Sequence, residues 1–238
     1  MKKTIFPTLL FLFCIYSANA QRKLALKWAP TGLLLGNINA QAEYGFGKHS
    51  SINIQFGIPS PRSYSPKFDD KDASISVKTT SFLAGYRIYA SHRKMRGFYF
   101  EPYFKNVHLM GTGSGSSTLQ GQPVVMNFTG DYKGSGVGVQ MGTQFVIAKR
   151  VVLDFYFIGP EINTSHANFK SIEVTNTIPW NSSQAAEAEQ NVRDFLDKIP
   201  VVGKKVDLTV DQNNRTITAD YKGLLPGFRF GLSIGIML

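Results

Sequence analysis

The chain contains a single cysteine, Cys14, among its 238 residues. Cys14 lies in an apolar run between two N-terminal lysines and a short stretch of small residues that ends at Ala20. A charged start, an apolar centre and small residues at the end are the parts of a cleavable secretion signal. We therefore predict a signal peptide over 1–20, and a mature chain without any thiol.

The missing thiols exclude several classes of exported protein. A lipoprotein signal would place a small residue directly before the acylated cysteine, whereas Phe13 precedes Cys14. Without cysteine the mature chain has no disulfide and no thiolate metal ligand, so it is not a small disulfide-bonded domain. Its stability must come from buried side chains or from a lipid environment.

Long apolar runs are also lacking after the signal. No later segment approaches the roughly 20 apolar residues of a membrane-spanning helix. The formal net charge of +10 falls to +8 when the two lysines of the signal are removed. Since no recognition helix or basic arm is visible, we expect no nucleic-acid partner and favour anionic lipid head groups as partners of the basic surplus.

The chain has many segments in which apolar residues alternate strictly with small or polar ones. The last twelve residues place large apolar side chains on one face and mainly glycine, serine and arginine on the other, which is the period of a β-strand. A strand that is apolar on one face and small or polar on the other is typical of a membrane β-barrel. The apolar positions are Phe228, Phe230, Leu232, Ile234, Ile236 and Leu238.

The same alternation recurs along the mature chain and gives eight strands. Short connectors alternate with long ones, and in outer-membrane barrels the short turns face the periplasm and the long loops face outward. The predicted fold is an all-β, eight-stranded, antiparallel up-and-down transmembrane barrel with a long extracellular loop that contains a helix. A soluble β-sandwich or a lipocalin-like barrel also alternates, but would carry charge on its outer face. The other seven strands are predicted over 23–29, 32–46, 52–58, 79–88, 98–105, 136–147 and 153–157, and the long connectors over 59–74, 111–130 and 165–216.

Three short motifs strengthen this interpretation. They are Lys27-Trp28-Ala29-Pro30, Gly36-Asn37-Ile38 and Glu43-Tyr44. With them the chain resembles the small eight-stranded outer-membrane barrels of the OmpA and OmpX type, and more closely a family of bacterial barrels of uncharacterised function. The resemblance implies a single barrel domain over 21–238 in the outer membrane of a Gram-negative bacterium.

Charged residues on the inward face should form the interior of the barrel. An eight-stranded barrel is just wide enough to be filled by its own side chains, so a fixed pore is not expected. If the turn before Gly97 is symmetric about Lys94, Arg87 lies opposite Glu101. The interpretations are a structural ion-pair network, which we favour, or a proton or ion relay. The inward charged residues are Glu43, Arg87, Glu101, Lys105, Asp154 and Arg229, whereas Lys78, Lys133, Glu161 and Lys222 fall on the apolar face near strand ends.

Catalytic and cofactor motifs are scarce. His108 and His166 are the only histidines on the outward side, and neither has the His-x-Ser spacing expected of a lipid hydrolase. The glycine runs lack the spacing of a dinucleotide fingerprint, and no cofactor or metal site is predicted. The run that begins at Gly111 is interpreted as a flexible loop.

The last long loop, 165–215, carries one helix. Ser182 or Ser183 can cap a helix over about 183–198 that Pro200 ends. Its apolar stripe should pack on the loop itself or on the barrel mouth. A hairpin should follow, with strands over 205–210 and 215–220. The stripe consists of Val192, Phe195, Leu196 and Ile199.

The expected function is that of a non-enzymatic, monomeric outer-membrane barrel. It would be an anchor that presents extracellular loops, with a structural, adhesive or envelope-stabilising role. Outer-membrane lipid is its expected partner, with an extracellular protein or surface ligand at the loops as a further possibility. The alternatives are an outer-leaflet lipid-modifying hydrolase that uses His108 or His166, and a binder of a small apolar ligand at the barrel mouth.

Overall fold

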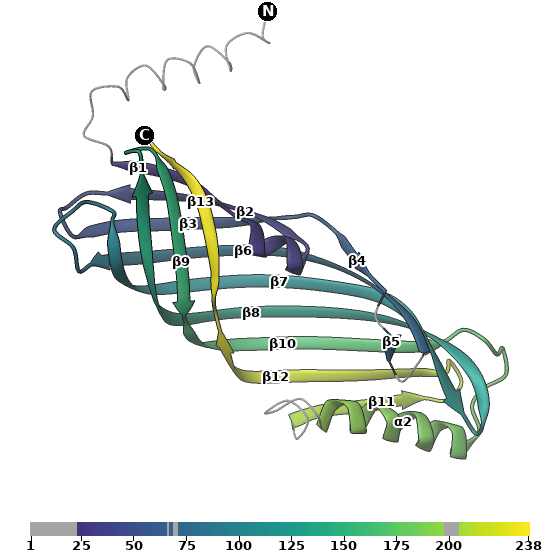
Figure 1. Cartoon of the computed structure of the whole chain (residues 1–238). Helices are drawn as coiled ribbons and strands as arrows, with labels where there is room; N and C mark the ends of the chain where they lie inside the picture. Colours follow the sequence, from purple (N-terminus) through teal and green to yellow (C-terminus); the bar gives the residue numbers. More distant parts are fainter. Residues whose placement is uncertain (1–22, 66, 69–70, 198–204) are drawn as a thin grey trace, which may run out of the picture.

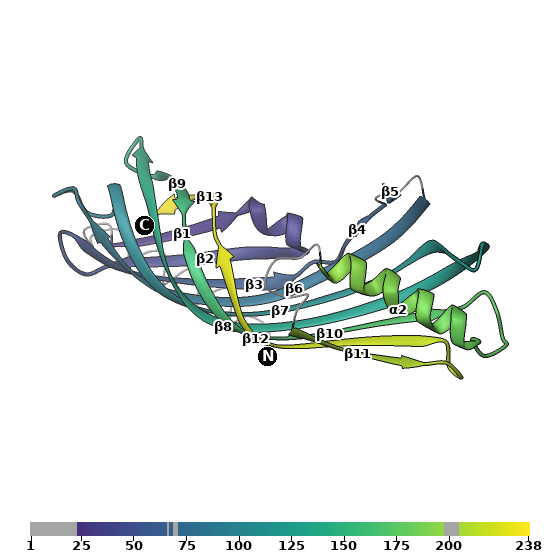
Figure 2. The same ribbon diagram turned by 90° about the horizontal axis from the view of Figure 1, so that it is seen from below.

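A computed structural model describes residues 23–65, 67–68, 71–197 and 205–238. The signal predicted over 1–20 lies outside the described residues. These residues form one curved antiparallel sheet with a single α-helix (Figures 1 and 2). The elements are β1 (Leu24–Ala29), η1 (Pro30–Leu35), β2 (Asn37–Gly45), β3 (Ser50–Pro59), β4 (Arg62–Tyr64), β5 (Lys67–Phe68), β6 (Lys71–Tyr89), β7 (Gly97–Leu119), β8 (Gln122–Ile147), β9 (Val151–Ile158), β10 (Pro160–Glu173), α2 (Ser182–Asp197), β11 (Val206–Asp211), β12 (Thr216–Phe228) and β13 (Gly231–Met237).

Eight strands close into a ring. Their order is β1, β2, β3, β6, β7, β8, β9 and β13, and β13 pairs with β1 to complete the circle. Leu26 faces Ile236 across this closing pair, and Leu24 accepts a backbone hydrogen bond from Leu238. The predicted ring of eight antiparallel strands is confirmed, and so are the short turns at the end of the ring where β1 begins.

The outer wall of the ring is apolar. Large side chains on the odd or even positions of each strand point away from the ring, and Phe56, Val137, Phe145 and Ile236 are each about half exposed. Their neighbours in sequence are small or polar and point inward, because successive residues of a strand alternate between its two faces. None of the helices in the described part of the chain has the length and apolar character that a membrane-spanning helix requires.

On one side, the wall rises far beyond the ring. Strands β6, β7, β8, β10 and β12 continue away from the short turns as an open sheet with β11 at its edge, and we call this part the extension (to the right in Figure 1). Two segments of the chain contribute strands to both the ring and the extension. The seventh strand is β9 in the ring and β10 in the extension, and the eighth is β13 in the ring and β12 in the extension.

The break between β9 and β10 changes which residues face inward. Phe157 and Ile158 are both exposed, and the register against β8 shifts between Met141 and Gly142. Such a bulge inserts one residue and therefore inverts the alternation that follows. Glu161 consequently points inward, and the prediction that it lies on the apolar face was wrong.

Two predicted loops are largely strand. β7 runs to Leu119 and β8 starts at Gln122, so the expected loop over 111–130 is a long hairpin. Its turn residues Gln120 and Gly121 have φ values of 52° and 73°, as a tight two-residue hairpin turn requires. Likewise β10 continues to Glu173 rather than ending near 165. Glycine, serine and threonine fill much of 111–118, and in 166–173 polar residues occur on both faces, so these stretches lack the strict alternation by which strands were recognised.

The start of the second strand also differs from expectation. Pro30–Leu35 is a 3₁₀ helix, and β2 begins only at Asn37 instead of Gly32. Gly36 ends this helix with a φ of 68°, and a Cβ at this residue would collide with the carbonyl oxygen of Val77. Only glycine combines this backbone conformation with such a close approach.

Helix α2 lies on the concave side of the extension (Figure 2). Asn181 caps it: its Oδ1 accepts a hydrogen bond from Gln184 N at 2.9 Å, and Gln184 Oε1 accepts one from Asn181 N at 3.0 Å. This reciprocal pair replaces the predicted Ser182 or Ser183 cap. Ile199 and the side chains of Phe195 and Leu196 lie outside the described residues.

The helix packs on the sheet of the extension, and Val192 is the described member of the predicted apolar stripe. Ala185, Ala188 and Val192 contact a small core between the helix and the strands. The predicted hairpin after the helix is confirmed by the pairing of β11 with β12. The core residues from the rest of the chain are Leu119, Val124, Trp180 and Ile217.

Candidate functional site

The centre of the ring is occupied by charge. Arg87 on β6 contacts three carboxylates: Glu101 at 2.6 Å from Nε, and Asp154 and Glu43 at 2.7 and 3.2 Å from Nη1. These side chains are at most 1% exposed. Burying charges is costly unless each is paired and hydrogen-bonded, and this cluster satisfies both conditions.

Lys27 completes this cluster from β1. Its Nζ lies 2.7 Å from Glu43 and 2.8 Å from Asp154, and it also donates to Gln144 at 3.0 Å. The sequence analysis used Lys27 only as part of a motif. Its position opposite Leu26 and Trp28 in the alternation was the signal that places it inward.

The register that brings these residues together is the predicted one. Gly85 pairs with Tyr103 and Ile88 with Phe100, which is the register symmetric about Lys94. Arg87 and Glu101 therefore lie opposite each other. The ladder between β6 and β7 is interrupted at this level, beside Pro102, which has no N–H to donate.

A shell of neutral donors surrounds the carboxylates. Tyr89 and Ser51 donate to Glu43 at 2.5 and 2.7 Å, and Tyr99 donates to Asp154 at 2.7 Å. Glu101 accepts from Gln140 at 2.6 Å and from Asn53 at 3.0 Å. These donors hold the side chains in place, so the interior of the ring is a packed polar core.

The other two residues of the predicted interior network, Lys105 and Arg229, lie nearer to the extension. Lys105 pairs with Glu161, which also accepts a hydrogen bond from Tyr103 at 2.9 Å. Arg229 donates to Gln140 at 2.9 Å and to Gln55 at 2.5 Å. Neither residue joins the central cluster.

Interior charge is balanced. In the part of the ring that the structure describes, four cations are matched by four carboxylates once Lys27 and Glu161 are added to the predicted set. A neutral, internally paired interior can hold its side chains without a counter-ion. The cations are Lys27, Arg87, Lys105 and Arg229, and the carboxylates are Glu43, Glu101, Asp154 and Glu161.

The histidines of the outward side have no catalytic partner set in the described structure. His108 Nε2 lies 2.7 Å from Asp131 Oδ2, on the outward face of the extension. Among the described residues, no hydrogen bond joins His108 or His166 to a serine. In the same part of the chain, no group of three His, Cys, Asp or Glu side chains could hold a metal ion.

The region under α2 is filled. Trp180, Leu119, Val124 and Ile217 are each at most 4% exposed and occupy the space between the helix and the sheet. These described side chains lie beneath the helix, where the alternative of a small apolar ligand would place its site.

A family model described as "Protein of unknown function (DUF3575)" matches residues 6–181 of the chain. The chain belongs to the DUF3575 family. The match includes every ring strand except β13 and carries no activity with it. Elements α2, β11, β12 and β13 lie beyond the matched residues.

Two further comparisons complete the picture of this DUF3575 member. No match was found among curated proteins. The crystal structure of CarO from Acinetobacter baumannii is similar at 10% sequence identity, covering 91% of this chain and 97% of that one, with a TM-score of 0.41.

Proposed function

We propose that this chain is an outer-membrane β-barrel that acts as a non-enzymatic, monomeric anchor and presents its extension outside the cell. The observation that supports this most is the inverted distribution of polarity in the ring. Apolar side chains cover the outer wall, and the charged residues lie inside. A soluble protein of this kind would expose a continuous apolar belt to water, which soluble monomers avoid.

The dimensions of the ring fit this proposal. Strands β2 and β3 have 9 and 10 residues. Tilted strands of about 9–11 residues are long enough to cross the apolar part of a bilayer. A closed ring leaves no unpaired edge, which lipid requires of any β-structure.

The interior favours an anchor over a transporter. Arg87, Lys27 and their carboxylates fill the lumen with side chains that would have to separate before a solute could pass. Removing one member of a buried ion pair typically costs 3–5 kcal/mol, so this arrangement favours a closed, rigid cylinder.

Outer-membrane location is tested by expressing the full chain in a Gram-negative host and separating the membranes. We expect the protein in the outer-membrane fraction, with a folded band in unboiled gels that heating converts to a slower one. Recovery in the soluble periplasmic fraction would contradict the proposal.

The lipid-facing wall is tested by a pair of lysine substitutions. Leu232 lies in the apolar belt, and Thr129 points outward in the extension. We expect Leu232→Lys to destabilise the folded barrel by about 2–4 kcal/mol near the bilayer centre, and Thr129→Lys to change stability little. Urea unfolding in lipid vesicles measures both, and equal tolerance would contradict a membrane-facing wall.

A further inference from the structure

A row of basic side chains crosses four neighbouring strands just above the apolar belt. His108 on β7 faces Lys133 on β8, Lys133 faces His166 on β10, and His166 faces Lys222 on β12. All four point outward, and the Lys133 side chain is 63% exposed. We call these four residues the basic row. Because neighbouring strands are about 4.8 Å apart, the row is about 14 Å wide.

Carboxylates lie on the side of the basic row that faces away from the ring. Asp131 lies 2.7 Å from His108 Nε2 and 3.6 Å from Lys133 Nζ. Asp220 and Asp207 are exposed at the same level, because Asn168 pairs with both Asp131 and Asp220, and Asp207 pairs with Asp220. The basic row itself combines two ammonium groups and two imidazoles, and it lies between these carboxylates and the ring, so a ligand that approaches from the ring side meets the cations first. This composition suits an anionic ligand that is larger than a single ion.

The next row toward the ring is neutral and polar. Asn106, Ser135 and Thr164 lie on the same outward face, two residues closer to the ring than His108, Lys133 and His166. Asn106 Nδ2 donates to Ser135 Oγ at 2.7 Å. Amide and hydroxyl groups at this level can bond to ester or amide carbonyls.

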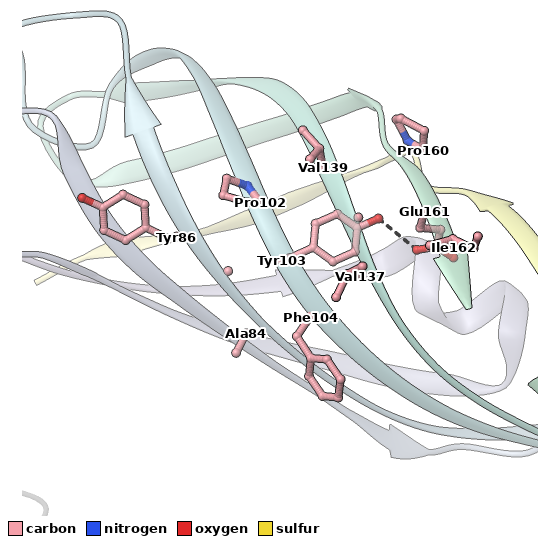
Figure 3. A pocket seen from close by; sticks show the side chains of 12 residues that line it. Ala84, Tyr86, Pro102, Tyr103, Phe104, Val137, Val139, Pro160, Glu161 and Ile162 are labelled. Carbon is pink, nitrogen blue, oxygen red and sulfur yellow. Dashed lines mark hydrogen bonds between the residues drawn. The ribbon is translucent and has the colours of Figure 1, made fainter. Parts of the chain in front are cut away.

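Below this polar row, the outer wall is hollowed. An open groove of about 870 Å³ crosses β6, β7, β8 and β10 (Figure 3). Small outward residues form its floor: Ala84, Pro102, Val139 and Pro160. The carboxylate of Glu161 turns away from it, toward Tyr103 inside the barrel, as the dashed bond in Figure 3 shows.

We propose that the basic row and this groove together bind one phosphorylated lipid of the outer leaflet, with phosphate at the row and an acyl chain in the groove. The inference rests on the proposed membrane position. From the extension toward the ring, the wall presents charged groups, then polar groups that can bind carbonyls, then the apolar groove. The head group, the linkage and the acyl chain of such a lipid follow in the same order. His108 lies four positions after Phe104, which lines the groove, and this spacing of about 14 Å along a strand leaves room for the linkage region.

The test uses the full chain, folded in mild detergent, and a diphosphorylated acylated glucosamine disaccharide as the probe. Native mass spectrometry measures the fraction of barrel that retains the lipid over a concentration series. The dephosphorylated form of the same lipid is the chemical control. We expect retention of the diphosphorylated lipid and at least tenfold weaker binding of the dephosphorylated one.

Variants then assign the binding to the basic row. We expect Lys133→Gln combined with Lys222→Gln to weaken binding at least tenfold, since each lysine near an anionic surface contributes separately. Lys48→Gln combined with Arg93→Gln removes the same charge at the opposite end of the ring and should leave binding unchanged. Equal binding by both double variants would overturn the proposal.

A second pair of measurements assigns the groove. Ala84→Phe combined with Val139→Phe fills the hollow with apolar side chains that a lipid-facing wall tolerates. This variant should bind the long-chain lipid several-fold more weakly. Displacement of the lipid by millimolar inorganic pyrophosphate alone, with no effect of filling the groove, would show a site for free phosphate and overturn the lipid assignment.

These outcomes are separable from the proposed function. Each variant is first checked for the heat-dependent shift in gels that reports a folded barrel. A folded, membrane-inserted protein that binds no phosphorylated lipid would overturn this inference and leave the anchor proposal standing.

Discussion

Arg87 is the residue on which the interior most depends. It contacts Glu43, Glu101 and Asp154 at once, and its guanidinium carbon lies 4.2 Å from the centre of the Tyr99 ring. A planar guanidinium with several fixed donors is suited to such multiple contacts, whereas a lysine ammonium is not. Replacing Arg87 would remove the ion pair of Glu101, whereas Glu43 and Asp154 would keep their contacts with Lys27.

A double-mutant cycle tests this arrangement. We expect Arg87→Met alone to cost about 3–5 kcal/mol, since it leaves the buried Glu101 carboxylate unpaired, and Glu101→Gln alone to cost less. Because the two residues contact each other, the double mutant should lose less than the sum. The free energies come from urea unfolding in lipid.

The cycle has a matched control. Combining Glu101→Gln with Lys48→Met, a change at the exposed Lys48, should give additive losses. Additive losses for Arg87 and Glu101 themselves would show that water screens the pair, and the argument for a closed lumen would fail.

One glycine corrects an expectation about substitutions in the ring. Gly235 faces inward, where alternation alone predicts that serine would be tolerated. A Cβ at Gly235 would instead collide with the carbonyl oxygen of Leu26 and with Lys27. The side chain is absent here because β1 and β13 approach closely where the ring closes, so Gly235→Ser should impair folding.

At the scale of elements, the sequence predicts the ring better than the extension. Within the ring, residues such as Leu232 and Ser233 differ sharply in polarity, so the face of each strand can be read directly. In the extension, Gly113 and Thr112 lie on opposite faces and are both small or polar, so the strand resembles a loop. Tertiary pairing, which no local pattern encodes, extends these strands.

The charged interior of the ring was predicted in outline because the two faces of the ring strands differ in polarity. Alternation places Arg87, Glu101 and Asp154 inward, and the turn symmetry gives the register. The bulge before Pro160 reverses the faces of β10, so Glu161 could not be assigned from alternation. Which inward charges meet across the lumen depends on ring closure, as for Lys27 and Asp154, and lies beyond sequence periodicity.

The hairpin of β11 and β12 gives a prediction about pH. Asp211 accepts hydrogen bonds from Asn214 N at 3.0 Å and Asn214 Nδ2 at 2.7 Å, and these bonds hold its pKa below the ordinary 3.8. A carboxyl group whose pKa is lowered by folding stabilises the folded turn above its unfolded pKa. That contribution is lost as the pH falls through the lower folded value.

We therefore expect the turn to stay intact at pH 5 and to loosen only below about pH 3.8. Amide NMR shifts and hydrogen exchange at Asn214 report this change. Asp211→Asn removes the titrating group, and its Asn214 signal should show no such acid transition. A transition that persists in this variant would contradict the assignment.

At the scale of the whole molecule, the ring of strands is closed and its interior is filled with side chains. The ring has eight strands, and barrels of this size are just wide enough for their own side chains. Four cations and four carboxylates among the described residues occupy that space, which makes the cylinder neutral inside and apolar outside.

A conductance measurement tests the filled interior. We expect purified protein in planar bilayers to give no stable single-channel steps, because the paired side chains block the lumen. Insertion must be verified in the same preparation by the heat-dependent gel shift. Regular, voltage-stable steps from inserted protein would instead indicate a solute path.

The two breaks in neighbouring strands lie at one level and form a crease. β9 gives way to β10 at Gly159, β12 gives way to β13 just after Phe228, and Arg229 N donates to Gly159 O across the gap at 2.7 Å. On one side of the crease β9 and β13 curve around the ring, and on the other side β10 and β12 belong to a flatter sheet (Figure 1). A sideways force on the extension would concentrate bending at this line. Arg229, which is bonded to Gln140 and Gln55 on other strands, then acts as a brace that transmits the force to the rest of the cylinder.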